Sequence, residues 1–309
     1  MTRVMDNSVH SINLCLAWNW EHDRDFKNIL EQACLRCNQV FLQVTPDNLD
    51  EICGQFLLHT VNLDVFFDRA SDSDPNFQPL VDWARQHASR RINPQEKSRW
   101  AWDKATMHLE LINAGLAAPY TIILPPFHDK VDLPPLDLSP LGEHFAIKPA
   151  HGGGSEGVVL EADSLNKVLS IRQELPNQKY LLQAQIIPLN LDGHPAWFRV
   201  LYCTGAVFPF WWNPQSHTYR SVSALERLSH GLRELSEITR RIARLCGLDL
   251  FSTEIALVQG NQLLIVDYVN DPVDLRLQTH AADGVPDDIV EKIARRLAMT
   301  AENIGSHHR

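Results

Sequence analysis

The first part of the chain alternates between short apolar runs and amphipathic stretches. The apolar runs are rich in β-branched and aromatic residues, and they predict buried strands at residues 12–18, 39–44 and 63–67. Between and after them, apolar residues recur at helical spacing, which predicts helices over residues 21–37, 48–58 and 76–88. Strands that alternate with helices are typical of an α/β unit with a parallel sheet, so we expect a small α/β domain over residues 1–97.

The middle of the chain changes character, because its strands are shorter and are separated by loops and turns. A helix is predicted from near Trp100 to Gly115, and residues 125–140 are rich in Pro and Asp, which indicates a surface loop. Short strands are predicted at residues 120–124, 145–147, 158–160 and 180–187, with a helix over 164–175. We expect a second unit over residues 98–187.

The last part of the chain reads as an antiparallel sheet with helices. Strands are predicted at residues 197–203 and 206–211, and a hairpin joins 253–258 to 262–269 across Gln259-Gly260-Asn261. Amphipathic helices are predicted at residues 232–246 and 287–298. We expect a third unit over residues 188–309.

The charge of the chain narrows the classes of partner. The 309 residues carry a formal net charge of −10, with 44% hydrophobic and 21% charged residues, as in ordinary globular proteins. A negative protein lacks the field that attracts nucleic acids or anionic membranes, so neither is an expected partner. A few lysines placed inside a pocket are still able to hold an anionic substrate.

The cysteines and the termini add little chemistry. The six cysteines are sparse and stand mostly in apolar surroundings, which favours buried free thiols in a reducing compartment. Cys34 and Cys37 form a lone pair on a predicted helix, without the second pair that a zinc site needs. The first ten residues lack the apolar core of a signal peptide, and no apolar run is long enough to span a membrane, so we expect a cytoplasmic protein.

A glycine-rich segment between two predicted strands is the strongest local motif. Lys148 precedes His151-Gly152-Gly153-Gly154-Ser155-Glu156-Gly157. Closely spaced glycines let backbone N–H groups approach a phosphate, and a lysine beside them supplies a point charge. The segment is neither a Walker A loop nor a Rossmann fingerprint, since no helix follows it with the required spacing. Taken alone, it is equally compatible with a plain glycine-rich hairpin and an exposed lysine.

Two carboxylates interrupt the last predicted hairpin. Glu254 stands on one strand and Asp267 on the next, and Asn270 and Asp271 follow where that strand ends. Carboxylate and amide oxygens suit Mg²⁺, which proteins usually hold with one or two carboxylates plus substrate phosphates. Burying these acids is costly unless a cation or donors compensate. The alternative is that both acids lie on the polar face of a half-exposed sheet.

Taken in order, several segments over residues 92–276 resemble the ATP-grasp superfamily, in particular carboxylate–amine or carboxylate–thiol ligases of the D-alanine–D-alanine ligase and ribosomal-protein glutamate ligase type. The segments are Asp103-Lys104 before a helix, the strand start at 114–121, Lys148-Pro149 with the glycine-rich segment, residues 180–186, residues 198–201 with 205–207, and residues 247–249 followed by Glu254, Asp267 and Asn270. The resemblance implies an α/β fold, with a Rossmann-like pre-ATP-grasp domain before a two-lobed ATP-grasp domain.

The resemblance also implies roles for individual residues. Lys104 and Lys148 would contact the α- and β-phosphates of ATP, and Arg199 would meet the γ-phosphate or an acyl-phosphate. The glycine-rich flap would close over the β- and γ-phosphates through Gly152, Gly153, Gly154, Ser155 and Gly157. Adenine would be held by Gln183, Ala184, Gln185 and Ile186, with Asp192 near the ribose. One or two Mg²⁺ ions would be bound by Glu254, Asp267 and Asn270.

Two positions depart from the pattern of that superfamily. The last metal strand usually carries Glu-x-Asn, whereas this chain has Asp267-Tyr268-Val269-Asn270. Either the amide comes one residue late, or Tyr268 occupies the acidic position and Asp267 points elsewhere, and Asp271 is a further candidate. Gln183 stands where a glutamate is common.

The function that follows from the resemblance is an ADP-forming ligase. ATP would phosphorylate a small-molecule or peptide carboxylate, and an amine or thiol would attack the acyl-phosphate. A small-molecule kinase of the same fold and a non-catalytic ATP-binding module are the alternatives, and the resemblance also allows a homodimer. After the third predicted strand, Asp68-Arg69 fits either a substrate-side loop or a surface ion pair. The aromatic run at 208–212 indicates packing.

Overall fold

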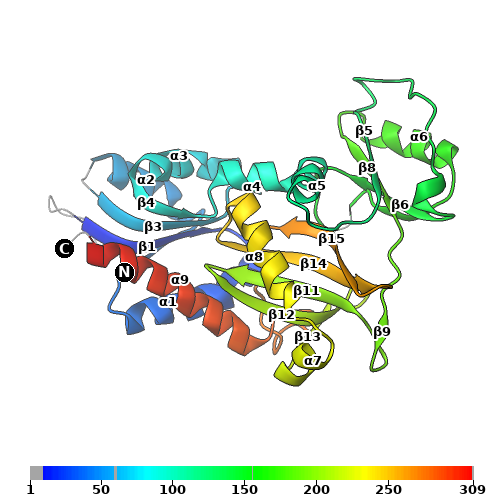
Figure 1. Ribbon diagram of the computed structural model, residues 1–309. Helices are drawn as coiled ribbons and strands as arrows, with labels where there is room; N and C mark the ends of the chain where they lie inside the picture. Colours follow the sequence, from blue (N-terminus) through cyan, green and yellow to red (C-terminus); the bar gives the residue numbers. More distant parts are fainter. Residues whose placement is uncertain (1–9, 59–60, 155, 308–309) are drawn as a thin grey trace.

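The computed structural model describes residues 10–58, 61–154 and 156–307. Its architecture is mixed α/β, with a four-stranded parallel sheet and two antiparallel sheets of five and four strands (Figure 1). The parallel sheet is N-terminal and has the order β2-β1-β3-β4. Its strands are β1 (His10–Trp18), β2 (Phe41–Val44), β3 (Val61–Arg69) and β4 (Ala88–Ile92).

Helices cover both faces of the parallel sheet. The apolar side chains of α2 (Leu49–Leu58) and α3 (Gln78–His87) pack on one face. The other face is covered by α1 (Arg24–Arg36) together with α9 (Asp287–His307), which comes from the opposite end of the chain. Short 3₁₀ turns at Glu21–Asp23 and Pro75–Phe77 lead into α1 and α3. The C-terminal helix is therefore part of the N-terminal core.

The large antiparallel sheet has the order β13-β12-β11-β14-β15. Its strands are β11 (Trp197–Cys203), β12 (Ala206–Asn213), β13 (Thr218–Ser221), β14 (Leu250–Val258) and β15 (Gln262–Asn270). One face packs in a cluster with α8 (Glu234–Cys246) and α5 (Lys104–Asn113), and the other shares the core of α1 and α9. The aromatic run at 208–212 lies on β12, and Phe210, Trp211 and Trp212 are buried, which confirms the packing prediction.

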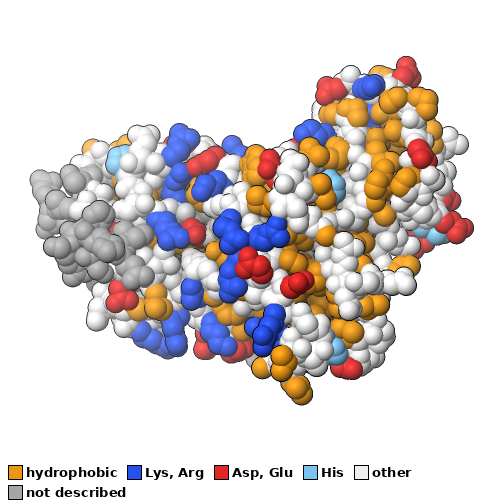
Figure 2. All heavy atoms as spheres, in the orientation of Figure 1, with side chains coloured by type: hydrophobic (Ala, Val, Ile, Leu, Met, Phe, Trp, Pro, Cys, Tyr) orange, Lys and Arg blue, Asp and Glu red, His pale blue; other side chains and the backbone are white. Residues whose placement is uncertain are grey.

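The small antiparallel sheet, with the order β5-β8-β6-β7, forms a lobe that projects from the rest of the molecule (Figures 1 and 2). It consists of β5 (Thr121–Leu124), β6 (Phe145–Pro149), β7 (Val159–Ala162) and β8 (Tyr180–Ala184). Helix α6 (Leu165–Glu174) packs on it, and the loop before β6 ends in a 3₁₀ turn at Ser139–Leu141. A two-stranded hairpin of β9 (Asn190–Leu191) and β10 (His194–Pro195), and helix α7 (Ala224–Ser229), complete the chain.

Some predicted elements differ from those of the structure. The helix predicted from Trp100 to Gly115 is two helices, α4 (Gln95–Trp102) and α5, which are broken at Asp103. Asp103 has extended backbone angles, and its carboxylate accepts hydrogen bonds from the N–H groups of Ala105 and Thr106, so it caps a new helix instead of continuing the old one. The strand predicted to reach residue 187 ends at Ala184, and β4, β13 and α7 were not predicted.

Three arginines near β4 and α3 are paired with carboxylates. Arg90 contacts Asp249 at 2.5 Å, Arg91 contacts Glu96 at 2.7 Å, and Arg85 contacts Asp82 at 3.2 Å. These arginines line a shallow groove of about 430 Å³ with Lys97. Because each of the three arginines has a carboxylate partner, the groove does not present the unpaired positive field that attracts polyanions.

Candidate functional site

Arg199 and the two predicted metal-binding acids lie on one face of the large sheet. Arg199 on β11 is directly opposite Glu254 on β14, and Glu254 is directly opposite Asp267 on β15. Side chains of directly opposed residues in antiparallel strands project to the same face, so these three side chains form a row across the sheet. The sequence prediction that Glu254 and Asp267 converge from paired strands is thereby confirmed in geometry.

Two irregularities in β15 bring Asn270 to the same face. Asn270 pairs with Ser252, Asp267 pairs with Glu254, and Ile265 pairs with Ile255, so β15 contains an extra residue on each side of Asp267. In a regular strand Asp267 and Asn270 would project to opposite faces, because side chains alternate with a period of two. The bulge between them restores the common face. The amide therefore comes one residue late in the sequence but joins the acids in space.

Tyr268 does not take the acidic position. Its side chain is 2% exposed and packs in the cluster beneath the opposite face, among the side chains that α5 and α8 cover. Its hydroxyl lies 2.8 Å from Nδ1 of His108 and 3.1 Å from Nε2 of Gln183. Asp271 is also engaged elsewhere, because its carboxylate accepts hydrogen bonds from Nδ2 of Asn93 at 2.8 Å and from Oγ of Ser98 at 2.5 Å.

Glu254 is held by two donors from the neighbouring strand. Nε1 of Trp197 donates to Oε2 at 3.0 Å, and Nη1 of Arg199 lies 3.3 Å from Oε1. Burial raises the pKa of Glu254, and the neighbouring charge of Asp267 raises it further. Arg199 is fixed in turn, since its Nε donates to Oγ of Ser252 at 3.2 Å and its guanidinium stacks 4.7 Å from the ring centroid of Trp212.

Lys148 reaches this row from the small lobe. It projects from β6, and its Nζ lies 2.8 Å from Oε1 of Gln183 and 3.5 Å from the carbonyl oxygen of Val266, the residue before Asp267. Burial lowers the pKa of the ammonium, whereas the charges of Asp267 and Glu254 act in the opposite direction. A positive side chain from one lobe and two carboxylates from the other thus share a site between the sheets.

Lys104 lies at the root of the glycine-rich segment. It is the first residue of α5, and its backbone N–H donates to the carbonyl of Ala150 at 2.9 Å. Its Nζ donates to the carbonyl of Gly152 at 2.5 Å. The second predicted lysine therefore meets the flap instead of the carboxylate row.

The glycine-rich segment leaves β6 as an exposed loop. Gly152, Gly154 and Gly157 have positive φ, a conformation that favours glycine, and Gly153 has open space where a side chain would project. Ser155 lies outside the described residues. The loop can therefore turn without steric cost and present backbone N–H groups.

The four residues predicted to hold adenine divide into two groups. Gln183 is 2% exposed and lies in β8, which pairs on both sides with β5 and β6, and its side chain is committed to Lys148. The predicted contact of Gln183 with adenine remains a prediction. Ala184 ends the strand, and Gln185 and Ile186 follow it in the segment that leads from the small lobe to the large sheet.

Asp192 lies apart from these residues. It occupies the turn between β9 and β10 with a positive φ of 51°, and its exposed carboxylate lies 2.8 Å from Nε2 of His230. This partner belongs to the segment between α7 and α8. The predicted ribose contact remains a prediction.

Several solved structures align with nearly the whole chain. They include a D-alanine–D-alanine ligase from Bacillus anthracis in complex with ATP, with a TM-score of 0.64, 12% identity, and coverage of 97% of this chain and 98% of that one. A RimK domain ATP-grasp protein from Sphaerobacter thermophilus aligns with a TM-score of 0.61, 15% identity, and coverage of 93% and 98%. The D-cycloserine synthetase DcsG aligns with a TM-score of 0.59, 16% identity, and coverage of 94% and 99%.

The chain has the ATP-grasp fold. No protein-family model and no curated protein matches the sequence, and at these low identities the likeness concerns the fold. The fold resemblance inferred from the motifs is confirmed, since the alignments extend over nearly the whole of both chains.

The donor set on the large sheet of the ATP-grasp fold suits Mg²⁺. Among the described residues no group of three or more His, Cys, Asp or Glu side chains is placed to hold a metal ion, so Glu254 and Asp267 are two carboxylates without a third. Asn270 adds an amide, and its Nδ2 is buried without a hydrogen-bond partner within the described part of the chain. Two carboxylates and an amide oxygen leave room for water and phosphate oxygens, as Mg²⁺ prefers.

Sequence reasoning missed several residues of this site in the ATP-grasp fold. Trp197, Ser252 and Trp212 hold Glu254 and Arg199 in place. The period of two along β11 and β14 was the available signal, because it puts Trp197 on the face of Arg199 and Ser252 on the face of Glu254. Trp212 has no such signal, since its contact depends on how β12 lies beside β11.

The reading of Asp68-Arg69 as a surface ion pair was wrong. Arg69 is 5% exposed and donates to both carboxylate oxygens of Asp23, at 2.7 and 2.8 Å, and to the carbonyl of Val273 at 2.9 Å. Asp68 accepts hydrogen bonds from Ser71 within the following turn. The buried pair ties the end of β3 to the segment that follows the metal strand.

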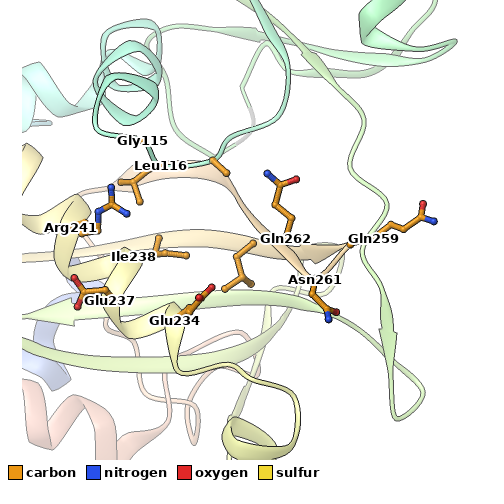
Figure 3. A pocket seen from close by; sticks show the side chains of 12 residues that line it. Gly115, Leu116, Glu234, Glu237, Ile238, Arg241, Gln259, Asn261 and Gln262 are labelled. Atoms are coloured by element: carbon orange, nitrogen blue, oxygen red, sulfur yellow. The ribbon is translucent and has the colours of Figure 1, made fainter.

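A hollow of about 610 Å³ lies beside α8 and the β14–β15 turn, away from the carboxylate row (Figure 3). Glu234, Glu237, Ile238 and Arg241 line it from α8, opposite the turn residues Gln259 and Asn261 (Figure 3). None of the predicted site residues lines this hollow.

No helix among the described residues has the length and apolarity needed to cross a membrane.

Proposed function

We propose that the protein is an ATP- and magnesium-dependent ligase that activates a carboxylate as an acyl-phosphate and transfers the acyl group to an amine or a thiol. The products from ATP would be ADP and phosphate. The observation that carries the proposal is the row of Arg199, Glu254 and Asp267 beneath Lys148, at the meeting of the two antiparallel sheets.

The structural neighbours support this class of reaction. They are named as a D-alanine–D-alanine ligase, a D-cycloserine synthetase, the ATP-grasp ligase PsnB in complex with a precursor peptide, and the macrocyclase MdnB. We extend from these names to a small-molecule or peptide carboxylate as the acid substrate. The parallel N-terminal sheet would form a Rossmann-like pre-ATP-grasp domain, and the carboxyl ends of its strands face the end of the metal strand through Arg69 and Val273.

The position of each residue supports a particular role in the proposed reaction. Lys148 would bind the inner phosphates, and Lys104 would orient the glycine-rich flap and reach the same phosphates when the flap closes. The flap, residues 152–157, would cover the outer phosphates and keep water from a reactive acyl-phosphate. Arg199 would stabilise the transferring phosphoryl group or the oxyanion of the later acyl transfer.

The metal and the adenine would occupy neighbouring positions. Glu254, Asp267 and Asn270 would hold one or two Mg²⁺ ions, which would neutralise charge on the terminal phosphates. Ala184, Gln185 and Ile186 would hold adenine at the segment between the lobes, and Asp192 would lie nearer the ribose. Gln183 would act on Lys148 instead of on adenine.

A hydroxylamine trap tests the reaction. The protein is incubated with ATP, Mg²⁺ and a panel of amino acids and short peptides, with hydroxylamine as the acceptor. We expect a hydroxamate together with ADP and phosphate, because an activated acyl group is intercepted by the strong nucleophile. ADP with a stable phosphorylated product and no free phosphate would instead identify a kinase, and AMP with pyrophosphate would exclude both.

An Arg199→Lys variant tests the proposed role of Arg199 in the same assay. Lysine keeps the charge but loses the guanidinium fork that spans Ser252 and Glu254. We expect nucleotide affinity to stay within about threefold while hydroxamate formation falls about a hundredfold, the size typical of a lost oxyanion donor. Equal activity of the two proteins would remove Arg199 from the proposed chemistry.

A further inference from the structure

A chain of hydrogen bonds leads from Lys148 into the core beneath the site. Nζ of Lys148 lies 2.8 Å from Oε1 of Gln183, and Nε2 of Gln183 lies 3.1 Å from the hydroxyl of Tyr268. The same hydroxyl lies 2.8 Å from Nδ1 of His108 on α5. Gln183 and Tyr268 are each 2% exposed and His108 is 7% exposed, so the chain runs through the interior.

The ammonium of Lys148 fixes the direction of the first two hydrogen bonds in the chain, and the tautomer of His108 sets the direction of the third. An ammonium group only donates, so the atom of Gln183 that faces Lys148 must be the carbonyl oxygen. The amide nitrogen then faces Tyr268 and donates to its hydroxyl oxygen. The phenolic proton remains free to be donated to Nδ1 of His108, which requires the tautomer with its proton on Nε2.

A second acceptor strengthens this orientation of Gln183. Nε2 of Gln183 lies 3.3 Å from Oγ1 of Thr121. The hydroxyl proton of Thr121 is donated to the carbonyl of Pro119 at 2.8 Å, so Oγ1 offers lone pairs to Gln183. The hydroxyl oxygens of Thr121 and Tyr268 therefore both accept a hydrogen bond from the amide nitrogen of Gln183.

Burial is consistent with this pattern. Burial lowers the pKa of His108, which favours the neutral ring that accepts at Nδ1, and burial raises the pKa of Tyr268, which keeps its proton in place. His108 and Tyr268 also lie side by side, with ring centroids 5.8 Å apart.

An amide at position 183 needs this support because its two ends are nearly equal in shape and opposite in hydrogen bonding. Turned over, Gln183 would point an NH₂ group at the ammonium of Lys148 and leave this half-buried ammonium with only the longer hydrogen bond to the carbonyl of Val266, which is costly. A carboxylate at the same position presents oxygen in either orientation. The extra partners are thus needed by glutamine and not by glutamate.

We propose that Tyr268, supported by His108, is a positioning residue that holds the carbonyl oxygen of Gln183 toward Lys148 and so places the nucleotide lysine. The inference rests on the proposed role of Lys148 in binding ATP. It assigns a task to the tyrosine that follows Asp267, and it accounts for the contacts of the Gln183 side chain with Lys148 and Tyr268.

Tyr268→Phe is the first test, because it removes the hydroxyl and keeps the ring. Calorimetric titration with a non-hydrolysable ATP analogue and Mg²⁺ should show affinity weakened about tenfold, since Gln183 loses one of the two acceptors that fix it. His108→Leu, which removes the acceptor of the phenolic proton, should weaken affinity in the same direction and provides a second route if Tyr268→Phe folds poorly.

Rescue by Gln183→Glu separates positioning from general damage. In the Gln183→Glu background, Tyr268→Phe should change analogue affinity less than twofold, because the carboxylate needs no orientation. The lost hydroxyl should lower the midpoint of thermal unfolding by a similar amount in both backgrounds. An equal loss of affinity in the two backgrounds, or no loss with Gln183 present, would overturn the inference.

Lys148→Ala distinguishes this inference from the proposed function. If Lys148→Ala binds the analogue as well as the wild-type protein, the nucleotide assignment itself fails. If Lys148→Ala abolishes binding while Tyr268→Phe acts alike in both backgrounds, the nucleotide assignment stands and only the positioning role is lost.

Discussion

At the scale of single residues, Lys148 and Glu254 are both shifted toward their neutral forms. Burial lowers the pKa of Lys148 and, aided by the charge of Asp267, raises the pKa of Glu254. Phosphate oxygens favour the charged lysine, and a divalent cation favours the charged glutamate. Bound phosphate and Mg²⁺ would therefore each oppose the effect of burial on the pKa of these two groups.

The two lysines should differ in importance for nucleotide binding. Lys148 is fixed on a strand and aimed beside Asp267, whereas Lys104 contacts the flap through the carbonyl of Gly152. We expect Lys148→Ala to abolish measurable binding of an ATP analogue and Lys104→Ala to weaken it about tenfold, as calorimetric titration would report. A larger loss in Lys104→Ala would reverse the assignment of the two lysines.

The carboxylates should account for the effect of Mg²⁺. We expect nucleotide affinity to increase with Mg²⁺, and the double variant Glu254→Gln with Asp267→Asn to lose that increase, because it removes two charges at nearly constant volume. Titrations with and without Mg²⁺ check this. Asp274→Asn is a control, since its carboxylate is paired with Arg276. If the double variant keeps the wild-type response to Mg²⁺, the metal binds elsewhere.

At the scale of elements, β15 shows which features a sequence does and does not predict. Its apolar run over residues 263–266 predicts the strand, the turn at residues 259–261 predicts its hairpin with β14, and Asp267 is the polar residue that interrupts the run. The bulge that brings Asn270 beside Asp267 leaves no local mark, because it depends on the pairing of Ser252 and Glu254 across the sheet. The hydrogen bonds of Gln183 are equally invisible, since their partners come from three other elements.

One helix boundary and one edge strand were also missed from the local pattern of apolar residues. The break between α4 and α5 was missed although Asp103 is a favoured capping residue, because the apolar positions on both sides continue with helical spacing. Strand β4 was missed because it carries Ser89, Arg90 and Arg91, which are polar residues that an edge strand tolerates. The local cap of Asp103 outweighs the helical spacing in the first case, and pairing with β3 forms the strand in the second.

The glycine-rich flap should respond to nucleotide. Its glycines are exposed, and few side chains hold the loop in place, so we expect rapid amide exchange over residues 152–157 in the free protein. Binding of an ATP analogue with Mg²⁺ should slow exchange at least tenfold there and leave the edge strand β4 unchanged. Hydrogen exchange measured by mass spectrometry checks this, and equal protection with and without nucleotide would contradict a closing flap.

At the scale of the whole molecule, the N-terminal sheet and the metal strand are joined through buried polar groups. Asp271 follows the metal strand and is bonded by Asn93 and Ser98, which belong to the segment after β4 and to α4. Burial raises its pKa to about 6, although these two donors lower it in part. A carboxyl group with a raised pKa binds a proton more tightly in the folded chain than in the unfolded chain.

This shift gives stability a pH dependence of known sign. Because the folded pKa lies above the ordinary value, the stabilising contribution is complete below about pH 4 and is lost as the pH rises through about 6. We therefore expect the free energy of unfolding of Asp271→Asn to rise relative to that of the wild-type protein between pH 4.5 and pH 8, by at most about 3 kcal/mol. Urea unfolding without Mg²⁺ measures this difference.

A second variant supplies a control of opposite sign. Burial acts to raise the pKa of Glu226, but hydrogen bonds from Ser223 and Arg220 lower it to about 2. Its carboxylate therefore stabilises the folded chain fully above its ordinary pKa, and the free energy of unfolding of Glu226→Gln should fall below that of the wild-type protein as the pH rises from about 2 to 4.5, with little further change up to pH 8. If the free energies of unfolding of Asp271→Asn and the wild-type protein differ by the same amount at all pH values, the raised pKa of Asp271 is contradicted.

The position of α9 has a consequence for synthesis of the chain. The helix covers β1, β3 and α1, and Nε2 of Gln39 donates to the carbonyl of Ala298 in its middle. About 220 residues separate Arg69, the end of β3, from Asp287, the start of α9. At roughly 10 residues per second, a ribosome needs about 20 s to make that stretch, during which the apolar face of the first sheet is covered by α1 without α9. A chain that terminates before α9 keeps this face open permanently, so premature termination should yield an aggregating fragment and not a shorter enzyme.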